Sequence, residues 1–179
     1  MGIPTLISTA TASDATSVDI TSGIDSTYDE YMFVCTDIHA RTDGAEFGFQ
    51  ANVASASGFN ETITSTFFNA FHQENDGEAS LDYVASFDQA QGTDYQEFMA
   101  NLGSGADESG AGILHLFNPS STVYVKHFYG RNNSFNYNGD RQYDTFVAGY
   151  FNVTGAIDEV SFKMSSGNMD GVIQMYGIK

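Results

Sequence analysis

The segment AEFGFQANV, residues 45–53, decides the expected fold because its apolar and polar residues alternate with the period of a β-strand. The side chains expected on the buried face are Ala45, Phe47, Phe49, Ala51 and Val53. Polar or small residues fill the positions between them, so the opposite face should meet solvent. The segment is therefore predicted to form a half-buried strand.

Two further runs extend this pattern. In VSFKM, residues 160–164, apolar residues again alternate with polar ones, and Ser161 and Lys163 are expected to point outward. In YMFVCTDI, residues 31–38, both faces are apolar. Such a run is typical of a strand in the middle of a sheet or at an interface.

Short runs of strand-forming residues, separated by turn residues, recur along the rest of the chain. They cover residues 6–12, 17–21, 62–72, 80–87, 113–117, 122–129, 145–153 and 172–178. Turns are indicated at residues 75–77, 138–140 and 166–168, each of which contains glycine and asparagine. Many short strands at this spacing favour an antiparallel β-sandwich or barrel. The length favours a single all-β domain over residues 1–179.

Residues 93–103 carry signals for both helix and strand. The apolar residues from Tyr95 to Leu102 have helical spacing, and Thr93 with Gln96 is placed as a capping box. A helix here would have only about two turns, and every neighbouring run predicts a strand. We therefore expect a strand that enters a turn.

The formal net charge is −17, from 23 acidic and 6 basic residues. Residues 1–125 contain 18 of the acids and one basic residue, Arg41, whereas residues 126–179 contain five of each. Binding of nucleic acid requires clustered Lys and Arg, so no nucleic-acid partner is expected. We interpret the acids as a solvated surface. Acidic and basic residues balance in residues 126–179, and we hypothesise that this last third supplies the docking or subunit contacts.

No stretch reaches the roughly 18 apolar residues that a membrane helix needs. The first residues, MGIPTLISTATAS, lack the basic and apolar regions of a secretion signal. The sequence therefore predicts folding in a cytoplasm and no membrane partner. Cys35 is the single cysteine, and its apolar neighbours predict a buried, unreactive thiol.

The motifs that usually mark catalytic or cofactor sites are missing from the sequence. The glycines at Gly103 and Gly105 are followed neither by a third glycine nor by a lysine at the spacing of a phosphate-binding loop. No serine stands in a G-x-S-x-G elbow, and no pair among the many carboxylates is singled out for glycoside hydrolysis. We expect neither an enzyme nor a cofactor.

Two arrangements could hold a metal ion. His115 and His127 lie in consecutive predicted strands and would be able to meet across a hairpin. The acidic stretch 74–78 resembles a calcium loop, although it lacks the alternating ligands and the distant glutamate of an EF-hand. Ordinary strand histidines and a solvated turn are the preferred interpretations, so no metal site is predicted.

Aromatic and polar side chains concentrate within residues 135–143. The candidate binding residues of a surface loop here are Tyr137, Asn138, Asp140 and Arg141. Such a combination is able to hold a glycan. A hairpin tip whose aromatic residues pack on the sheet or on a neighbouring subunit is the preferred alternative.

Three stretches of the chain resemble a family of bacteriophage virion structural proteins that is common in phages of marine bacteria. They are ITSGIDSTYDEY (20–31), GSGADESGAGILHLFNPSSTVYVKHF (103–128) and AGYFNVTGAIDEVSFKMSSGN (148–168), the last continuing to MYGI (175–178). The resemblance covers most of the chain and is least close between residues 61 and 94. It implies a jelly-roll-like β-sandwich in the outer parts of a virus particle and no catalytic residues.

The leading hypothesis from this resemblance is a capsid decoration or cement protein on the outer surface of the virion head. Its partners would be the major capsid protein or other virion proteins, and it would form a homo-oligomer, expected to be a trimer. The alternative is a receptor-binding module of a tail or fibre that recognises host surface glycans through residues 135–143. An enzyme that degrades polysaccharides is a third hypothesis, but it would need convergent carboxylates that the sequence does not indicate.

Overall fold

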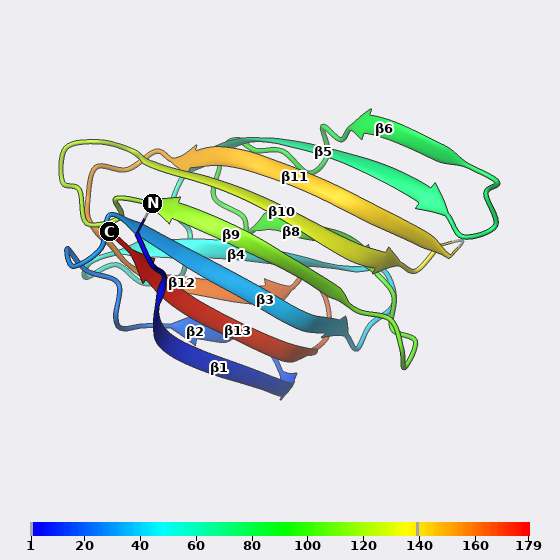
Figure 1. The fold of residues 1–179 in the computed structure, drawn as a ribbon. Coiled ribbons are helices and arrows are strands. Elements are labelled where there is room, and N and C mark those ends of the chain that lie inside the picture. Colours follow the sequence, from blue (N-terminus) through cyan, green and yellow to red (C-terminus); the bar gives the residue numbers. More distant parts are fainter. Residues whose placement is uncertain (1, 139) are drawn as a thin grey trace.

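The computed structural model describes residues 2–138 and 140–179, which form thirteen strands paired only in antiparallel fashion. Most of them lie side by side in one large sheet (Figure 1). In spatial order this sheet contains β1 (Thr5–Ala15), β13 (Met169–Ile178), β3 (Glu30–Ala40), β9 (Gly110–Phe117), β10 (Lys126–Asn136), β11 (Arg141–Phe151), β5 (Ile63–Gln73) and β6 (Ala79–Tyr83). The short β7 (Ala90–Gly92) pairs with the other end of β5.

A smaller sheet lies behind the large one (Figure 1). It contains, in spatial order, β2 (Val18–Ile20), β12 (Ile157–Met164), β4 (Ala45–Val53) and β8 (Gln96–Leu102). The two sheets join where Asn136 of β10 pairs with Leu102 of β8. The protein is thus an all-β, jelly-roll-like antiparallel sandwich, which confirms the predicted fold class.

Aromatic rings fill the space between the sheets. The ring of Phe49 lies 5.1 Å from that of Phe128, 6.3 Å from those of Phe98 and Phe151, and 6.5 Å from that of Phe162, measured between centroids. These five rings come from β4, β10, β8, β11 and β12, and all are buried. Aromatic pairs of this kind contribute about 0.5–1.5 kcal/mol each beyond the area that they bury. Phe49 therefore ties strands of both sheets to one core.

The strands expected from alternation are present. β4 spans the predicted residues 45–53, and residues 31–38 lie within β3, an inner strand between β13 and β9. Residues 96–102 form a strand, β8, so the preferred interpretation of the ambiguous segment is confirmed. Cys35 is buried, as expected, and burial raises the pKa of its thiol to about 12.

The outer face of β4 differs from the prediction because it does not meet solvent. Gln50 and Asn52 are buried along with the apolar residues. The Gln50 side-chain amide donates to the main-chain carbonyl oxygens of Glu61 at 2.9 Å and Asp94 at 3.0 Å. The segment before β5 and the segment after β7 thus cover this face. Hydrogen bonds to them replace those that the buried polar side chains would otherwise make with water.

The boundaries of β10 and β11 were also predicted incorrectly. The expected strand 122–129 is replaced by Lys126–Asn136, and the expected strand 145–153 by Arg141–Phe151. The inward residues Asn132, Ser134 and Asn136 are polar yet buried, so the alternation of burial in β10 has no matching alternation of hydropathy. The Asn132 side chain donates to the main-chain carbonyl of Phe98 at the seam between the sheets.

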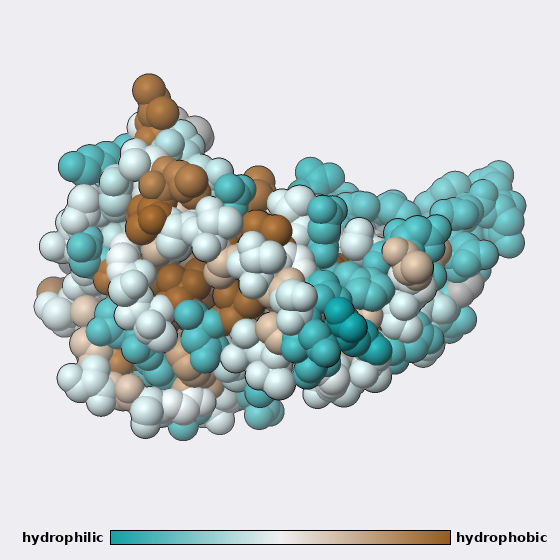
Figure 2. Space-filling view, turned by 90° about the horizontal axis from the view of Figure 1, so that it is seen from below, coloured by the Kyte–Doolittle hydropathy of each residue, from teal (hydrophilic) through white to brown (hydrophobic). Residues whose placement is uncertain are grey.

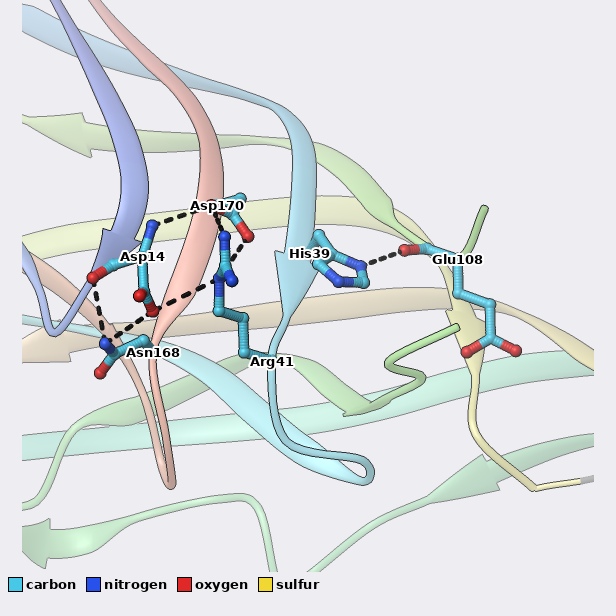
Figure 3. Close-up of polar contacts among 6 residues, drawn as sticks. All are labelled: Asp14, His39, Arg41, Glu108, Asn168 and Asp170. Atoms are coloured by element: carbon cyan, nitrogen blue, oxygen red, sulfur yellow. Dashed lines mark hydrogen bonds and ion pairs between the residues drawn. The ribbon is translucent and has the colours of Figure 1, made fainter. Parts of the chain in front are cut away.

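A polar cluster ties one end of the sandwich together (Figure 3). The Arg41 guanidinium, at the end of β3, binds both carboxylate oxygens of Asp170 in β13, at 2.9 and 2.8 Å, and approaches Asp14 in β1 at 3.4 Å. Asn168 donates to the carboxylate of Asp14 at 2.9 Å, and the Asp14 amide donates to Asp170 at 2.8 Å. Next to the cluster, His39 Nδ1 donates to the main-chain carbonyl of Glu108 at 2.8 Å. The one basic residue of the acidic first two-thirds thus holds three segments together.

A carboxyl group is partly buried on the outer side of the small sheet. The pKa of Glu97 is raised to about 7, chiefly by burial and to a smaller extent by the nearby carboxylates of Glu46 and Asp94, against a main-chain hydrogen bond that lowers it. The neighbouring Lys163 ammonium lies 4.1 Å from the centre of the Tyr95 ring. The folded protein therefore favours the neutral form of Glu97.

Replacing Arg41 with Met should lower the Tm at pH 7, because Asp14 and Asp170 would lose their shared cation. A decrease of about 2–4 °C is expected for a surface cluster in a chain of this size. The hydrogen bond from Arg41 lowers the pKa of Asp170 from 3.8, so this contribution is present above pH 3.8 and is lost as the pH falls through the lowered pKa. Thermal unfolding followed by circular dichroism at several pH values, with Asp170→Asn completing a double-mutant cycle, measures it. Additive effects of the two substitutions would contradict the coupling.

The Glu97→Gln variant should be more stable than the wild type at pH 8 and equally stable at pH 4. Because the folded pKa is raised, the neutral form of Glu97 favours folding below the unfolded pKa of 4.5, and this advantage disappears as the pH rises through about 7. After allowance for solvent screening, the gain at pH 8 should be about 1–2 kcal/mol in the free energy of unfolding. Urea unfolding at both pH values tests this, with Asp107→Asn in the exposed β8–β9 loop as the control. A gain of the same size at pH 4 would argue against a raised pKa.

Candidate functional site

The outer face of the large sheet is hollowed into a groove of about 870 Å³. In Figure 2, which views the molecule from below, the outline is hollowed between the end that carries the termini and the projecting β5–β6 hairpin. Adjacent strands β3, β9, β10, β11 and β5 contribute the lining. The groove therefore lies across paired strands and away from the sheet edges.

The orientation of β10 determines which of its side chains reach the groove. Phe128 and Asn132 point toward the small sheet and are buried, whereas Tyr129, Arg131 and Asn133 point outward. Because successive residues of a strand face opposite sides, the packing of the core fixes this choice.

A row of stacked rings borders the groove, and two of its rings, Tyr129 and His115, line it. The ring of Tyr129 lies 4.7 Å from the imidazole of His115, its cross-strand partner, and 5.5 Å from the ring of Phe117. The carboxylate of Glu30 contacts His115 Nδ1 and fixes the orientation of the imidazole. Tyr129 is still 49% exposed, so its apolar surface and hydroxyl group remain available to a ligand.

An ion pair forms the adjoining part of the groove lining. Arg131 donates from Nε and Nη2 to the two carboxylate oxygens of Asp144, at 2.9 and 2.8 Å. Its guanidinium also lies 4.8 Å from the centre of the Phe146 ring, which stacks on Phe68 at 5.0 Å. Hydrogen bonding to Arg131 lowers the pKa of Asp144, and the same contact raises the pKa of Arg131. The pair is therefore charged at neutral pH, and the guanidinium keeps N–H groups that the carboxylate does not use.

The residues predicted as a binding loop contact different parts of the chain. They belong to a short β10–β11 hairpin tip, whose middle residue, Gly139, lies outside the described residues. The Tyr137 ring lies against Gly44 in the β3–β4 turn. Arg141 instead pairs with Glu78 at 2.6 Å and stacks over Phe71.

The other two residues of the predicted set use main-chain groups in hydrogen bonds within the chain. The Asn138 amide donates to the side chain of Asn136 at 2.9 Å, and the carbonyl of Asp140 accepts from the amide of Glu74 at 3.0 Å. The tip therefore packs on neighbouring elements of the same chain. Tyr137 and Arg141 contact different elements.

The histidines that the sequence placed in consecutive strands do not meet. In the β9–β10 register His115 pairs with Tyr129, whereas His127 pairs with Tyr150 of β11. Among the described residues, no three His, Cys, Asp or Glu side chains gather closely enough to hold a metal ion. The part of the chain that the structure describes also contains no helix suited to crossing a membrane.

The groove is not visible in the local sequence, because its residues are dispersed from Val34 to Asp144. One local signal was present: Tyr129 and Arg131 stand two residues apart, the spacing that places two side chains on one face of a strand. That signal indicates an exposed aromatic residue beside an arginine, but it does not place them next to Ile113 or Asp144, which requires the strand register.

Comparisons with known proteins give no relative from which to transfer a function: no protein-family model, no curated protein and no solved structure matches this chain.

Proposed function

We propose that the protein is a structural component of a bacteriophage particle, a decoration protein that binds the outer surface of the head and stabilises the shell. The resemblance of three sequence stretches to phage virion proteins motivates this proposal. The observation that carries it is an apolar surface at one end of the sandwich. The opposite end carries acidic hairpin tips, so the two ends of the molecule present different chemistry to a partner.

The apolar end carries side chains that are far more exposed than is usual for their type. Ile3 is 90% exposed, Tyr124 71% and Val123 67%. The termini and the β9–β10 loop lie at this end of the sandwich (Figure 1), and apolar residues gather over the same half of the surface (Figure 2). A hollow of about 520 Å³ lies beside Val123 and Tyr124. Exposed apolar side chains gathered at one end of a molecule are typical of protein–protein contacts.

The β9–β10 loop is held in place before any partner binds. The ammonium group of Lys126 is buried, which lowers its pKa, and it donates to the main-chain carbonyls of Tyr124 at 2.7 Å and Val153 at 3.2 Å. The Ser121 hydroxyl accepts hydrogen bonds from the amides of Val123 at 3.2 Å and Tyr124 at 3.1 Å. A preorganised loop loses little conformational entropy when it docks.

The opposite end is formed by the β5–β6 and β10–β11 hairpins (Figure 1). Its tips carry Glu74, Asp76, Glu78 and Asp140. This acidic surface favours contact with water and repels nucleic acid and other acidic surfaces. The basic residues of the last third do not form a separate docking face, because β10–β13 are distributed over both sheets among the earlier strands.

In this proposal the apolar end buries its side chains against the major capsid protein or another virion protein, and copies of the chain associate as trimers. Burial of apolar area contributes roughly 25 cal/mol per Å², and stable interfaces bury about 800 Å² on each partner. Contacts of that size across capsomer junctions would resist the internal pressure of packaged DNA.

Particles that lack the protein should assemble but release their DNA at a lower temperature than wild-type particles, because the shell loses those junction contacts. A fluorescent DNA-binding dye added during a temperature ramp measures the release. Antibody labelling of intact particles locates the protein over the head in the proposed case. Equal thermal stability, or labelling confined to a tail or fibre, would contradict the proposal.

Binding of the purified protein to undecorated heads should be about 10-fold weaker, or more, after the double substitution Val123→Ser and Tyr124→Ser, since exposed aromatic and aliphatic anchors dominate interface energies. Leu81→Ser is the matched control, because Leu81 is 71% exposed but belongs to β6 at the other end. Co-sedimentation with heads measures both. Equal loss in the control, or no loss in the double variant, would show that docking uses another surface.

A further inference from the structure

A ligand in the groove on the large sheet would be bound through side chains alone. Its central strands β9, β10 and β11 are each hydrogen-bonded to a strand on both sides. Their main-chain donors and acceptors are therefore used within the sheet, and an extended peptide cannot add to them as a further strand. A ligand here has to satisfy the exposed side chains.

Those side chains are amphipathic as a set. Ile113 and the Tyr129 ring present apolar surface, and both are exposed. Arg131, Asn133 and Gln142 add hydrogen-bonding groups within the same lining. A sugar ring combines a face of C–H groups with a rim of hydroxyl groups, so it matches aromatic surface flanked by planar polar groups.

The charges of the groove favour a neutral ligand. Arg131 is neutralised by Asp144 in a two-point contact, and the chain as a whole carries a formal charge of −17. A polyanion would be repelled by the overall field and would find no free cation in that pair. A hydroxyl group can still accept a hydrogen bond from the remaining guanidinium N–H groups and donate one to the carboxylate.

The dimensions suit a short chain of sugars. The volume of about 870 Å³ falls within the usual range of small-ligand sites. The lining crosses from β3 to β5 over neighbouring strands about 4.8 Å apart, which gives a span of about 19 Å.

We propose that this groove is a binding site for a neutral oligosaccharide, with Tyr129 as the stacking residue and Arg131 with Asp144 as the hydroxyl-binding pair. The site is separate from the apolar end and from the β10–β11 hairpin tip. It operates wherever in a particle the protein is placed, so its test is independent of the docking proposal.

The purified protein should bind at least one of maltohexaose, laminarihexaose, cellohexaose and mannohexaose with a Kd below about 1 mM, as measured by isothermal titration calorimetry. The anionic hexagalacturonate should bind about 10-fold more weakly, or worse, than the best neutral hexasaccharide. Amide chemical shifts in β9, β10 and β11 should move on titration. Failure of all four neutral probes, or preference for the anionic one, would overturn the proposal.

Substitution of a single tyrosine distinguishes the groove from the hairpin tip. Tyr129→Ala should weaken binding by about 10-fold or more, because it removes the stacking surface. Tyr137→Ala is the matched control, since Tyr137 is 48% exposed, almost the same as Tyr129, but lies at the tip. Arg131→Met should also weaken binding without changing the circular dichroism spectrum. Loss of binding in Tyr137→Ala with retention in Tyr129→Ala would place the site at the tip and refute the groove.

Discussion

The packing of aromatic rings between the two sheets is the interaction on which the rest of the structure depends. The sheets share little backbone hydrogen bonding beyond the contact of Asn136 with Leu102, so burial of rings such as Phe49 holds them face to face. This packing also fixes the outer surface. Once Phe128 is committed to the core, the two-residue period of a strand places Tyr129 and Arg131 on the opposite face. The composition of the groove is therefore a consequence of the core, although none of its outward side chains contributes to that core.

The sequence predicted the fold where apolar residues mark the inward face of a strand. That is the case in β4, where the inner face carries phenylalanines, and in β3, whose apolar outer face reflects its position inside the large sheet. The prediction failed where polar residues are buried with partners. Lys126 and Asn132 both point inward on β10. Lys126 donates to the main-chain carbonyls of Tyr124 in the preceding loop and of Val153, and Asn132 donates to that of Phe98 in β8. Such partners are set by tertiary structure, so local pattern does not reveal them.

The candidate site was harder to predict than the fold for a related reason. Sequence proximity drew attention to Tyr137 and Arg141, yet a tight hairpin directs them to different neighbours. The groove instead gathers Tyr129, Arg131 and Asp144 by antiparallel register across β9, β10 and β11. Register is a long-range property, which depends on every turn between the strands. The difference between the two ends is equally hard to predict from the sequence, because each end contains loops from widely separated parts of the chain.

The position of β13 has a consequence for how the chain is made. This strand lies between β1 and β3, so the two strands that a ribosome produces early have no common partner until residues 169–178 emerge. Pairing over such a separation in sequence is slow to form, and unpaired strands are open to association with other copies meanwhile. The stretch synthesised first is also the acidic one, with 18 acids and one basic residue in residues 1–125. Like charges therefore keep neighbouring nascent chains apart while β1 and β3 wait for the strand that joins them.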